Sequence, residues 1–286
     1  MPSEIIQWFP GHMARTRREI GENLKNVDFV IELLDARIPK SSENPEIARI
    51  CGDKPRLTLC SRVSLADPKY TKEWKAYFAE NGRTCIFYDC ITGEGFSEIT
   101  PAARALVAGK LERYRERGME GRKLRAMIVG IPNVGKSSII NKLSGTKSAK
   151  VENRPGVTVN KQWIPTEIGL DLLDMPGVLW PKFEDEVIGQ NLAFTGAIRD
   201  QILDTEEIAM LLCGRLMECA PKEFMARYKL TEDETEGLDC YDLFELVGRK
   251  RGFLISGGEI NHERTANMLL EEFRAAKIGR ITLEKP

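Results

Sequence analysis

The sequence lacks long apolar runs, paired cysteines and an excess of positive charge. No apolar run approaches the length of a membrane span. The seven cysteines are scattered and form no Cys-x-x-Cys pair, which argues against a zinc site and against a disulfide framework. The first residues lack the basic and apolar blocks of a secretory signal. We therefore expect a cytoplasmic protein with reduced thiols and no membrane partner.

The net charge of −1 gives the chain no overall attraction to nucleic acid. Any RNA contact must come from local basic clusters, of which residues 110–125, 249–251 and 274–280 are the candidates. Such charge runs more often face water, so both interpretations stay open. With 42% apolar and 30% charged residues over 286 positions, the composition is that of a globular protein of one or two domains.

A phosphate-binding loop occupies residues 130–138, with the sequence Gly-Ile-Pro-Asn-Val-Gly-Lys-Ser-Ser. An apolar strand precedes it and an amphipathic helix follows it, which is the context that the Gly-x-x-x-x-Gly-Lys-Ser pattern requires. Backbone N–H groups at the start of such a helix surround phosphates, the lysine reaches the terminal phosphates and the first serine holds Mg²⁺. The expected nucleotide-binding residues are Asn133, Val134, Gly135, Lys136, Ser137 and Ser138.

Two further segments downstream fit the switch regions of a nucleotide-hydrolysing protein. Asp174-Met175-Pro176-Gly177 follows an apolar strand at 170–173. Asp174 is expected to hold Mg²⁺ through water, and the backbone N–H of Gly177 to contact the γ-phosphate. Between this segment and the loop, residues 154–158 (Arg-Pro-Gly-Val-Thr) supply Thr158, which is expected to complete the Mg²⁺ shell.

The order of these elements is unusual, because the phosphate loop normally opens a small GTPase domain. Here more than a hundred residues precede it, with predicted strands at 28–34, 56–60 and 84–88 and a helix at 69–81. The order predicts a circularly permuted α/β GTPase domain, a mostly parallel sheet with helices on both faces. One long helix is expected at 97–117.

The pattern changes near residue 200, where predicted helices at 206–218, 222–228, 241–250 and 259–275 follow one another without strands. We expect a permuted GTPase domain at residues 1–180 and a connector to the switch at 181–200. Residues 201–286 are expected to form a helical C-terminal domain that contacts RNA or the ribosome.

These motifs together resemble the YlqF/RbgA family of circularly permuted GTPases nearly end to end. The resemblance implies a GTP- and GDP-binding enzyme that hydrolyses GTP during late assembly of the bacterial large ribosomal subunit. It also implies Mg²⁺ as cofactor, a precursor particle of rRNA and ribosomal proteins as partner, and a monomer when free. Segments that carry it are 8–13 (Trp-Phe-Pro-Gly-His-Met), 35–39 (Asp-Ala-Arg-Ile-Pro), 130–138, 154–158, 174–183, 195–198 (Thr-Gly-Ala-Ile) and 256–261 (Ser-Gly-Gly-Glu-Ile-Asn).

The base-reading elements depart from the family pattern. The guanine-reading Asn-Lys-x-Asp falls at Ser61-Arg62-Val63-Ser64, so Ser64 cannot offer the bidentate carboxylate of the usual Asp. The supporting serine of the next loop is Cys90, which follows Asp89. Arg62 can still cover the base with its planar guanidinium. No compensating carboxylate is obvious, since Asp67 is three residues late. A charge-assisted hydrogen bond contributes about 1.5–3 kcal/mol, so we expect weakened GTP binding.

The water-positioning glutamine of many GTPases is Val178 here, and an apolar side chain cannot orient water. The resemblance implies that His12 performs this role, since a neutral imidazole accepts a hydrogen bond from water; a helix-capping or packing role is the alternative. Asn133 occurs in a pattern that supports a K⁺ ion beside the phosphates in related GTPases, or else only shapes the loop.

Three functions fit the sequence to different degrees. A Mg²⁺-dependent GTPase acting as a switch on a ribosomal precursor fits best. The alternative is an RNA-associated assembly factor with degenerate guanine recognition and little or no hydrolysis, or a relaxed nucleotide preference. A small-molecule kinase shares the phosphate loop, but the segments at 154–158 and 174–177 are switch elements and no acceptor signature appears.

Overall fold

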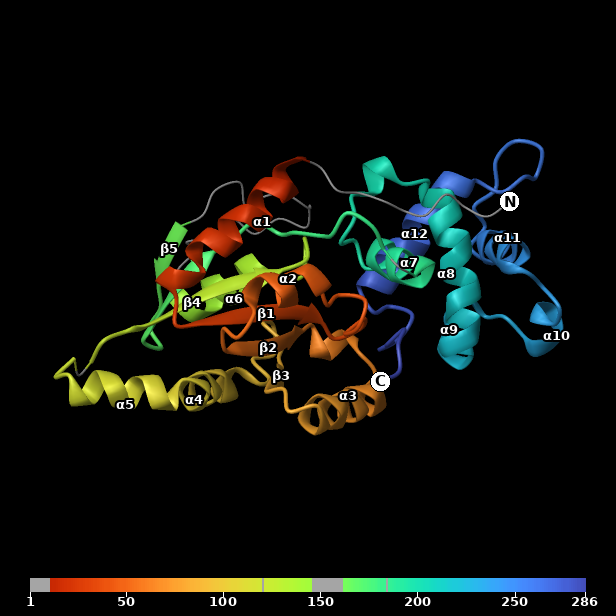
Figure 1. Ribbon diagram of the computed structural model, residues 1–286. Coiled ribbons are helices and arrows are strands. Elements are labelled where there is room, and N and C mark those ends of the chain that lie inside the picture. Colours follow the sequence, from red (N-terminus) through yellow and green to blue (C-terminus); the bar gives the residue numbers. More distant parts are fainter. Residues whose placement is uncertain (1–10, 120, 146–161, 184) are drawn as a thin grey trace.

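A six-stranded sheet forms the centre of the structure, a computed structural model that describes residues 11–119, 121–145, 162–183 and 185–286 (Figure 1). The strand order is β3-β2-β1-β4-β6-β5, with β5 antiparallel to β6 and all other pairs parallel. The strands are β1 (Phe29–Asp35), β2 (Arg56–Ser61), β3 (Cys85–Phe87), β4 (Leu124–Gly130), β5 (Gln162–Pro165) and β6 (Leu170–Asp174). The expected mostly parallel sheet is confirmed.

The sheet explains the unusual order of motifs along the chain. The phosphate-loop strand β4 lies inside the sheet, between β1 and β6. The three strands that precede β4 in sequence lie on one side of it, and the two strands that follow it lie on the other. Every residue of β1 is buried, as expected for a strand covered on both faces.

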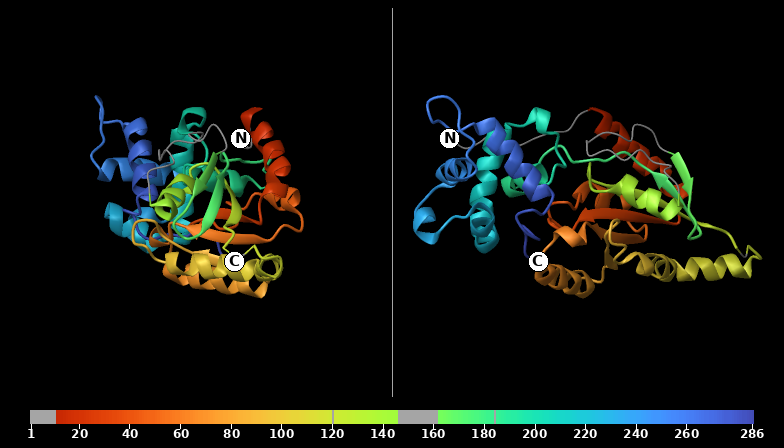
Figure 2. Two further views of the ribbon diagram at one scale, coloured as in Figure 1. Left: turned by 90° about the vertical axis from the view of Figure 1, so that its left-hand side faces the viewer. Right: turned by 180° about the vertical axis from the view of Figure 1, so that it is seen from behind.

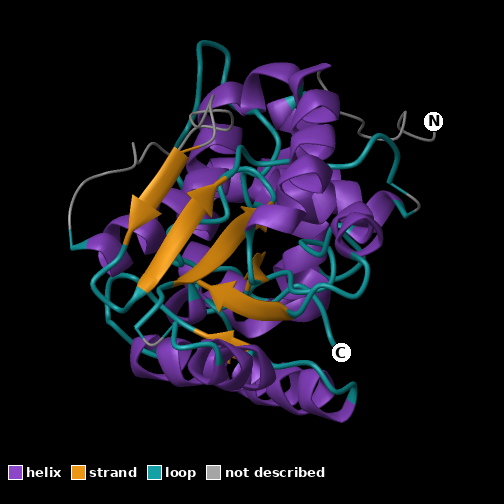
Figure 3. Cartoon of the chain, turned by 60° about the vertical axis from the view of Figure 1, so that its left-hand side comes forward, coloured by secondary structure: helices purple, strands orange, loops and turns teal. Residues whose placement is uncertain are grey.

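Helices cover both faces of this sheet (Figure 3), with α1 and α2 packed together on one side and α6 on the other (Figure 2). Asn44 and Asp67 cap α2 and α3, each followed by proline at the first helical position. The helices here are α1 (Gly11–Asn23), α2 (Pro45–Cys51), α3 (Pro68–Glu80), α4 (Phe96–Leu106), α5 (Ala108–Glu116) and α6 (Lys136–Ser144), with 3₁₀ turns η1 (Leu24–Asn26) and η2 (Val63–Leu65).

The expectation of one long helix at 97–117 is wrong, because the chain forms two helices that meet at Val107. Val107 has φ −114° and ψ 21°, which is outside the helical region. Its side chain is buried, and Gly109 follows closely. β-branched residues and glycine are poorer helix formers than alanine or leucine. The break therefore falls where the helix propensity of the sequence is low.

The chain beyond β6 is helical in its described residues. α8 is the central helix of this part and packs against α7, α9, α11 and α12. Aspartate or asparagine side chains cap α7, α8, α11 and α12 at their N-termini. The elements are α7 (Glu186–Phe194), η3 (Asp200–Ile202), α8 (Thr205–Cys219), α9 (Pro221–Tyr228), α10 (Glu232–Thr235), α11 (Cys240–Lys250) and α12 (His262–Arg274).

After α12 the chain returns to the sheet domain and ends beside α3 (Figure 1). We call residues 280–284 the C-terminal strap. The backbone N–H of Ile281 donates to the carbonyl of Leu65, and that of Leu283 to the carbonyl of Arg37. Glu284 accepts hydrogen bonds from the backbone of Ser41 and from the side chain of Asn191 in α7. The strap therefore joins the helical part to two loops at the edge of the sheet.

Candidate nucleotide-binding site

The phosphate loop connects β4 to α6 as predicted. Asn133 has φ 56° and Gly135 has φ 100°, and these left-handed residues turn the chain so that α6 starts at Lys136. The Lys136 ammonium is buried and donates to the carbonyls of Ile131 (3.0 Å) and Gly130 (3.4 Å). Burial lowers the pKa of Lys136 to about 8, against the opposing effect of Asp174. A buried cation at a helix N-terminus is a fitting site for a phosphate anion.

The Asp174–Gly177 segment lies against this loop. Asp174 ends β6 and is buried, and its charge acts on Lys136. A Cβ added at Gly177 would lie 2.7 Å from Cα of Pro132 and 3.0 Å from Nζ of Lys136, so only glycine allows this approach. The backbone N–H of Val178 donates to the carbonyl of Gly130 at 3.1 Å. The two predicted phosphate motifs are thus adjacent.

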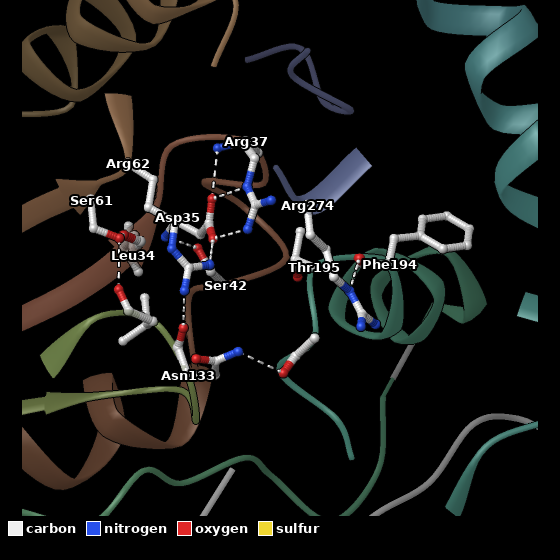
Figure 4. Close-up of polar contacts among 12 residues, drawn as sticks. Leu34, Asp35, Arg37, Ser42, Ser61, Arg62, Asn133, Phe194, Thr195 and Arg274 are labelled. Atoms are coloured by element: carbon white, nitrogen blue, oxygen red, sulfur yellow. Dashed lines mark hydrogen bonds and ion pairs between the residues drawn. The ribbon is translucent and has the colours of Figure 1, made fainter. Parts of the chain in front are cut away.

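The altered base-reading segment follows β2 and contacts the phosphate loop (Figure 4). Ser61 ends β2, and its Oγ lies 2.7 Å from the carbonyl of Val134 and 3.1 Å from that of Leu34. Arg62 adopts φ 61°, and its guanidinium donates to Asp35 (2.9 Å) and to the carbonyl of Asn133 (2.5 Å). The guanidinium is therefore tied to the phosphate loop and to Asp35.

Asp35 has no role in the sequence prediction, although it belongs to the segment 35–39 that carries the resemblance. Its carboxylate accepts a hydrogen bond from the guanidinium of Arg62 and two hydrogen bonds from that of Arg37, with which it forms a bidentate ion pair. Burial opposes its ionisation, but the two arginines outweigh burial and lower the pKa of Asp35 to about 2. The sequence signal was an Asp at the end of an apolar strand, the same signal as at Asp174.

A carboxylate that the sequence analysis did not connect with Ser64 lies next to it in the structure, that of Asp89. The hydroxyl of Ser64 donates a hydrogen bond to the carboxylate of Asp89, which follows β3. Burial opposes ionisation of Asp89, but hydrogen bonds from Ser64, Thr92 and Ile91 outweigh it, so the pKa of Asp89 is lowered. Cys90 is half-buried, and burial raises the pKa of its thiol to about 11. Asp67 instead caps α3 through Lys69 N–H.

The phosphate loop also contacts the segment after α7. The side-chain amide of Asn133 donates to the carbonyl of Gly196 at 3.3 Å (Figure 4). Gly196 has φ 78°, and a Cβ there would lie 3.4 Å from the guanidinium of Arg274. Arg274, from α12, donates to the carbonyls of Phe194 and Ala193 and forms a bidentate pair with Asp200. The helical part therefore reaches the phosphate loop through Gly196.

Some predicted site residues lie outside the described residues. Thr158 is one of them, and so is the side chain of His12, whose backbone is in the first turn of α1. The neighbouring Met13 is buried, and its sulfur lies 3.5 Å from the backbone nitrogen of Leu179. Val178 is also buried. The start of α1 therefore packs beside the chain that follows Gly177.

Several residues of the basic clusters form ion pairs or hydrogen bonds within the protein. Arg251 pairs with Glu272, and Arg274 with Asp200. Arg280, in the C-terminal strap, donates to the carbonyls of Ala66 and Val63. Within the described residues no helix is long and apolar enough to span a membrane.

Comparisons with known proteins identify the family to which the chain belongs. A family described as 50S ribosome-binding GTPase matches residues 125–225. The chain is 45% identical to ribosome biogenesis GTPase A of Bacillus cereus over 99% of this chain and 94% of that protein. It is 46% identical to that of Priestia megaterium, covering 98% and 97%. The crystal structure of GNP-bound YlqF from Thermotoga maritima superposes with a TM-score of 0.63 at 27% identity, covering 95% and 98%. The chain belongs to the ribosome biogenesis GTPase A family.

Proposed function

We propose that this protein binds GTP where β2, β3, β4 and β6 end, hydrolyses it, and acts in late assembly of the bacterial large ribosomal subunit. The observation that carries the proposal is the buried ammonium of Lys136. It lies at the N-terminus of α6 and 3.0 Å from where a Cβ of Gly177 would be, with its pKa lowered by burial. A buried cation at the N-terminus of a helix fits a triphosphate, and the relatives are named for ribosome biogenesis.

Mg²⁺ fits the donors at this edge. Ser137 lies in the first turn of α6 and Asp174 ends β6, and oxygen donors of these kinds suit Mg²⁺. Ser137 and Thr158 would hold the ion directly and Asp174 through water, and Mg²⁺ would neutralise charge on the phosphates. A K⁺ ion would use the side-chain oxygen of Asn133, since the amide nitrogen of that side chain is engaged by Gly196.

The guanine base lies over the segment at Ser61, Arg62 and Ser64 and beside Asp89 and Cys90, with the phosphates on the loop from Asn133 to Ser138. His12 positions the attacking water, because Val178 is apolar and buried. The contact between Met13 and Leu179 supports this assignment, since it holds the start of α1 beside the Gly177 segment.

The partner is the precursor particle, through its rRNA and ribosomal proteins, and the helical part from residue 201 contacts it. The free protein is a cytoplasmic monomer. Nucleotide state is transmitted through Asn133 and Gly196, because this contact joins the phosphate loop to the chain between α7 and α8. The segment at 181–200 serves as the connector.

Nucleotide binding and hydrolysis by the purified chain, with and without precursor particles, test this proposal. Lys136→Ala is expected to abolish GTP binding while leaving the fold intact, judged by circular dichroism. Lys142→Ala, on the exposed side of the same helix, is the matched control and should bind normally. Unchanged GTP affinity in Lys136→Ala overturns the assignment of the loop. Normal binding without hydrolysis on particles favours an RNA-associated factor instead.

A further inference from the structure

Two polar side chains meet where the base-reading loops of β2 and β3 come together. Ser64 is half-exposed in η2, and Asp89 is buried after β3. Their loops are also joined by a hydrogen bond from the backbone N–H of Val63 to the carbonyl of Tyr88. Ser64 occupies the position at which the family pattern has the guanine-reading Asp. Asp89, on the neighbouring loop, provides a carboxylate that is hydrogen-bonded to Ser64.

The direction of this hydrogen bond is fixed by the surroundings of Asp89. Its Oδ1 accepts from the backbone N–H groups of Ile91 (2.7 Å) and Thr92 (3.1 Å), so Oδ2 is the atom that faces Ser64. An ionised carboxylate can only accept, so the Ser64 hydroxyl must donate its proton to it. The Ser64 oxygen then keeps its lone pairs for a ligand and acts as an acceptor only.

We propose that Ser64 and Asp89 together read guanine, with Ser64 accepting a hydrogen bond from guanine N1–H or the 2-amino group and Asp89 orienting and polarising Ser64. This inference rests on the proposed function and assigns its base specificity. Guanine presents two donors at this edge, whereas adenine presents the acceptor N1 there. An acceptor-only hydroxyl therefore pairs with guanine and leaves two acceptors facing each other with adenine.

The position of the pair relative to the phosphate loop supports the assignment. In the same segment, Ser61 contacts the carbonyl of Val134 and Arg62 that of Asn133. Ser64 lies in the 3₁₀ turn η2 that directly follows these residues. Ligands of parallel sheets bind at the carboxyl ends of the strands, and both members of the pair lie at that end.

A single substitution should reverse the polarity of the pair. In Asp89→Asn the two backbone N–H groups of Ile91 and Thr92 favour an oxygen at the Oδ1 position, and they outnumber the one backbone N–H of Ser64 that also donates to this carboxylate, so we expect the amide nitrogen to face the Ser64 hydroxyl. That nitrogen donates to the Ser64 oxygen and releases the hydroxyl proton toward the ligand. The variant should bind GTP about 10- to 100-fold more weakly and gain preference for xanthosine triphosphate, whose 2-oxo group accepts.

A second substitution tests whether the two positions act as one unit. Ser64→Asp alone places two carboxylates in contact and should weaken GTP binding, because like charges repel. Combined with Asp89→Asn, the amide at position 89 can donate to the new carboxylate. The double variant should then recover at least about tenfold in GTP affinity over Asp89→Asn alone, a coupling characteristic of contacting residues.

The experiment measures equilibrium affinities of the full chain for GTP, inosine, xanthosine and adenosine triphosphates by competition against a fluorescent guanine nucleotide. The parent should prefer GTP, with the inosine nucleotide next and ATP at least about tenfold weaker. Asp67→Asn is the matched control, because Asp67 caps α3, and it should leave every ratio unchanged. Thermal unfolding checks each fold, and Ser64→Ala, which should lose GTP preference, serves if Asp89→Asn does not fold.

The outcomes separate this inference from the proposed function. A parent that binds no nucleotide overturns the proposed function. A parent that binds GTP, with a GTP-to-ATP ratio unchanged by Asp89→Asn or by Ser64→Ala, overturns the assignment of the pair alone. Equal affinities of the parent for GTP and ATP would also overturn the assignment of the Ser64–Asp89 pair, but not the proposed function.

Discussion

Arg37 and Asp35 form a bidentate ion pair in which both side chains are almost completely buried. Arg37 Nε lies 2.9 Å from Asp35 Oδ1, and Nη2 lies 2.7 Å from Oδ2. The same guanidinium lies 5.7 Å from the ring centre of Phe273 in α12, and the carbonyl of Arg37 accepts from Leu283 of the strap. The pair thus stands where the sheet domain, the helical part and the C-terminal strap meet.

Arg37→Ala is expected to lower the free energy of unfolding by about 3–5 kcal/mol, because it leaves a buried carboxylate with one partner fewer. Chemical denaturation measures the loss. Arg49→Ala, at an exposed arginine of α2, is the control and should cost less than about 1 kcal/mol. A small loss in Arg37→Ala would mean that Arg62 alone balances Asp35.

Arg280→Ala should loosen the base-reading loop. The substitution removes the two hydrogen bonds that the strap donates to the carbonyls of Val63 and Ala66. We expect a loss of about 1–3 kcal/mol in stability and weaker guanine-nucleotide binding, measured by denaturation and by nucleotide titration. Arg264→Ala, at an exposed arginine of α12 whose guanidinium lies over the ring of Phe253, should cost less than about 1 kcal/mol in stability and leave nucleotide binding unchanged. Unchanged binding in a destabilised Arg280→Ala would restrict the strap to a structural role.

His12→Ala is expected to slow GTP hydrolysis about 10²- to 10⁴-fold, the usual effect of removing a positioned acid–base group. GTP affinity should change little, since the side chain contacts the attacking water and not the nucleotide. Hydrolysis is measured with ribosomal particles present, because the side chain can complete its placement on the particle. If His12→Ala hydrolyses GTP at the parent rate on those particles, the ribosome itself must supply the catalytic group.

Glu32 should make the protein less stable as pH rises toward neutral. Its carboxyl is buried in β1, and burial raises its pKa to about 7, despite Arg56 and Arg83 and with Glu43 adding to the rise. A raised folded-state pKa means that the stabilisation is fully present below the ordinary value near 4.5 and is lost as pH rises through about 7.

Unfolding free energies from pH 4.5 to 8 test this, and the parent should lose about 2–4 kcal/mol through this group. Glu32→Gln should flatten the profile, whereas Glu218→Gln, at an exposed position of α8, should leave it unchanged. Parallel profiles for parent and Glu32→Gln would show that Glu32 titrates normally.

Local pattern was sufficient for several parts of the fold. Apolar runs at 28–34 and 170–173 predicted β1 and β6, because a strand covered on both faces needs apolar residues throughout. The helix at 69–81 was predicted from its spacing, and the structure begins it at Pro68, after the Asp67 cap. The long helix at 97–117 failed, since a one-residue break at Val107 leaves little trace in periodicity.

The sequence by itself determined the phosphate loop, the Asp174–Gly177 segment and the permuted order, because these depend on residue types at fixed short spacings. Only the tertiary structure brings the carboxylate of Asp89 into contact with Ser64. Asp89 lies 25 residues away in the chain, and their contact exists because β2 and β3 pair in parallel and end at the same edge. The reach of the strap to Val63 and Ala66 is likewise a long-range contact, more than 200 residues apart, which no local pattern encodes.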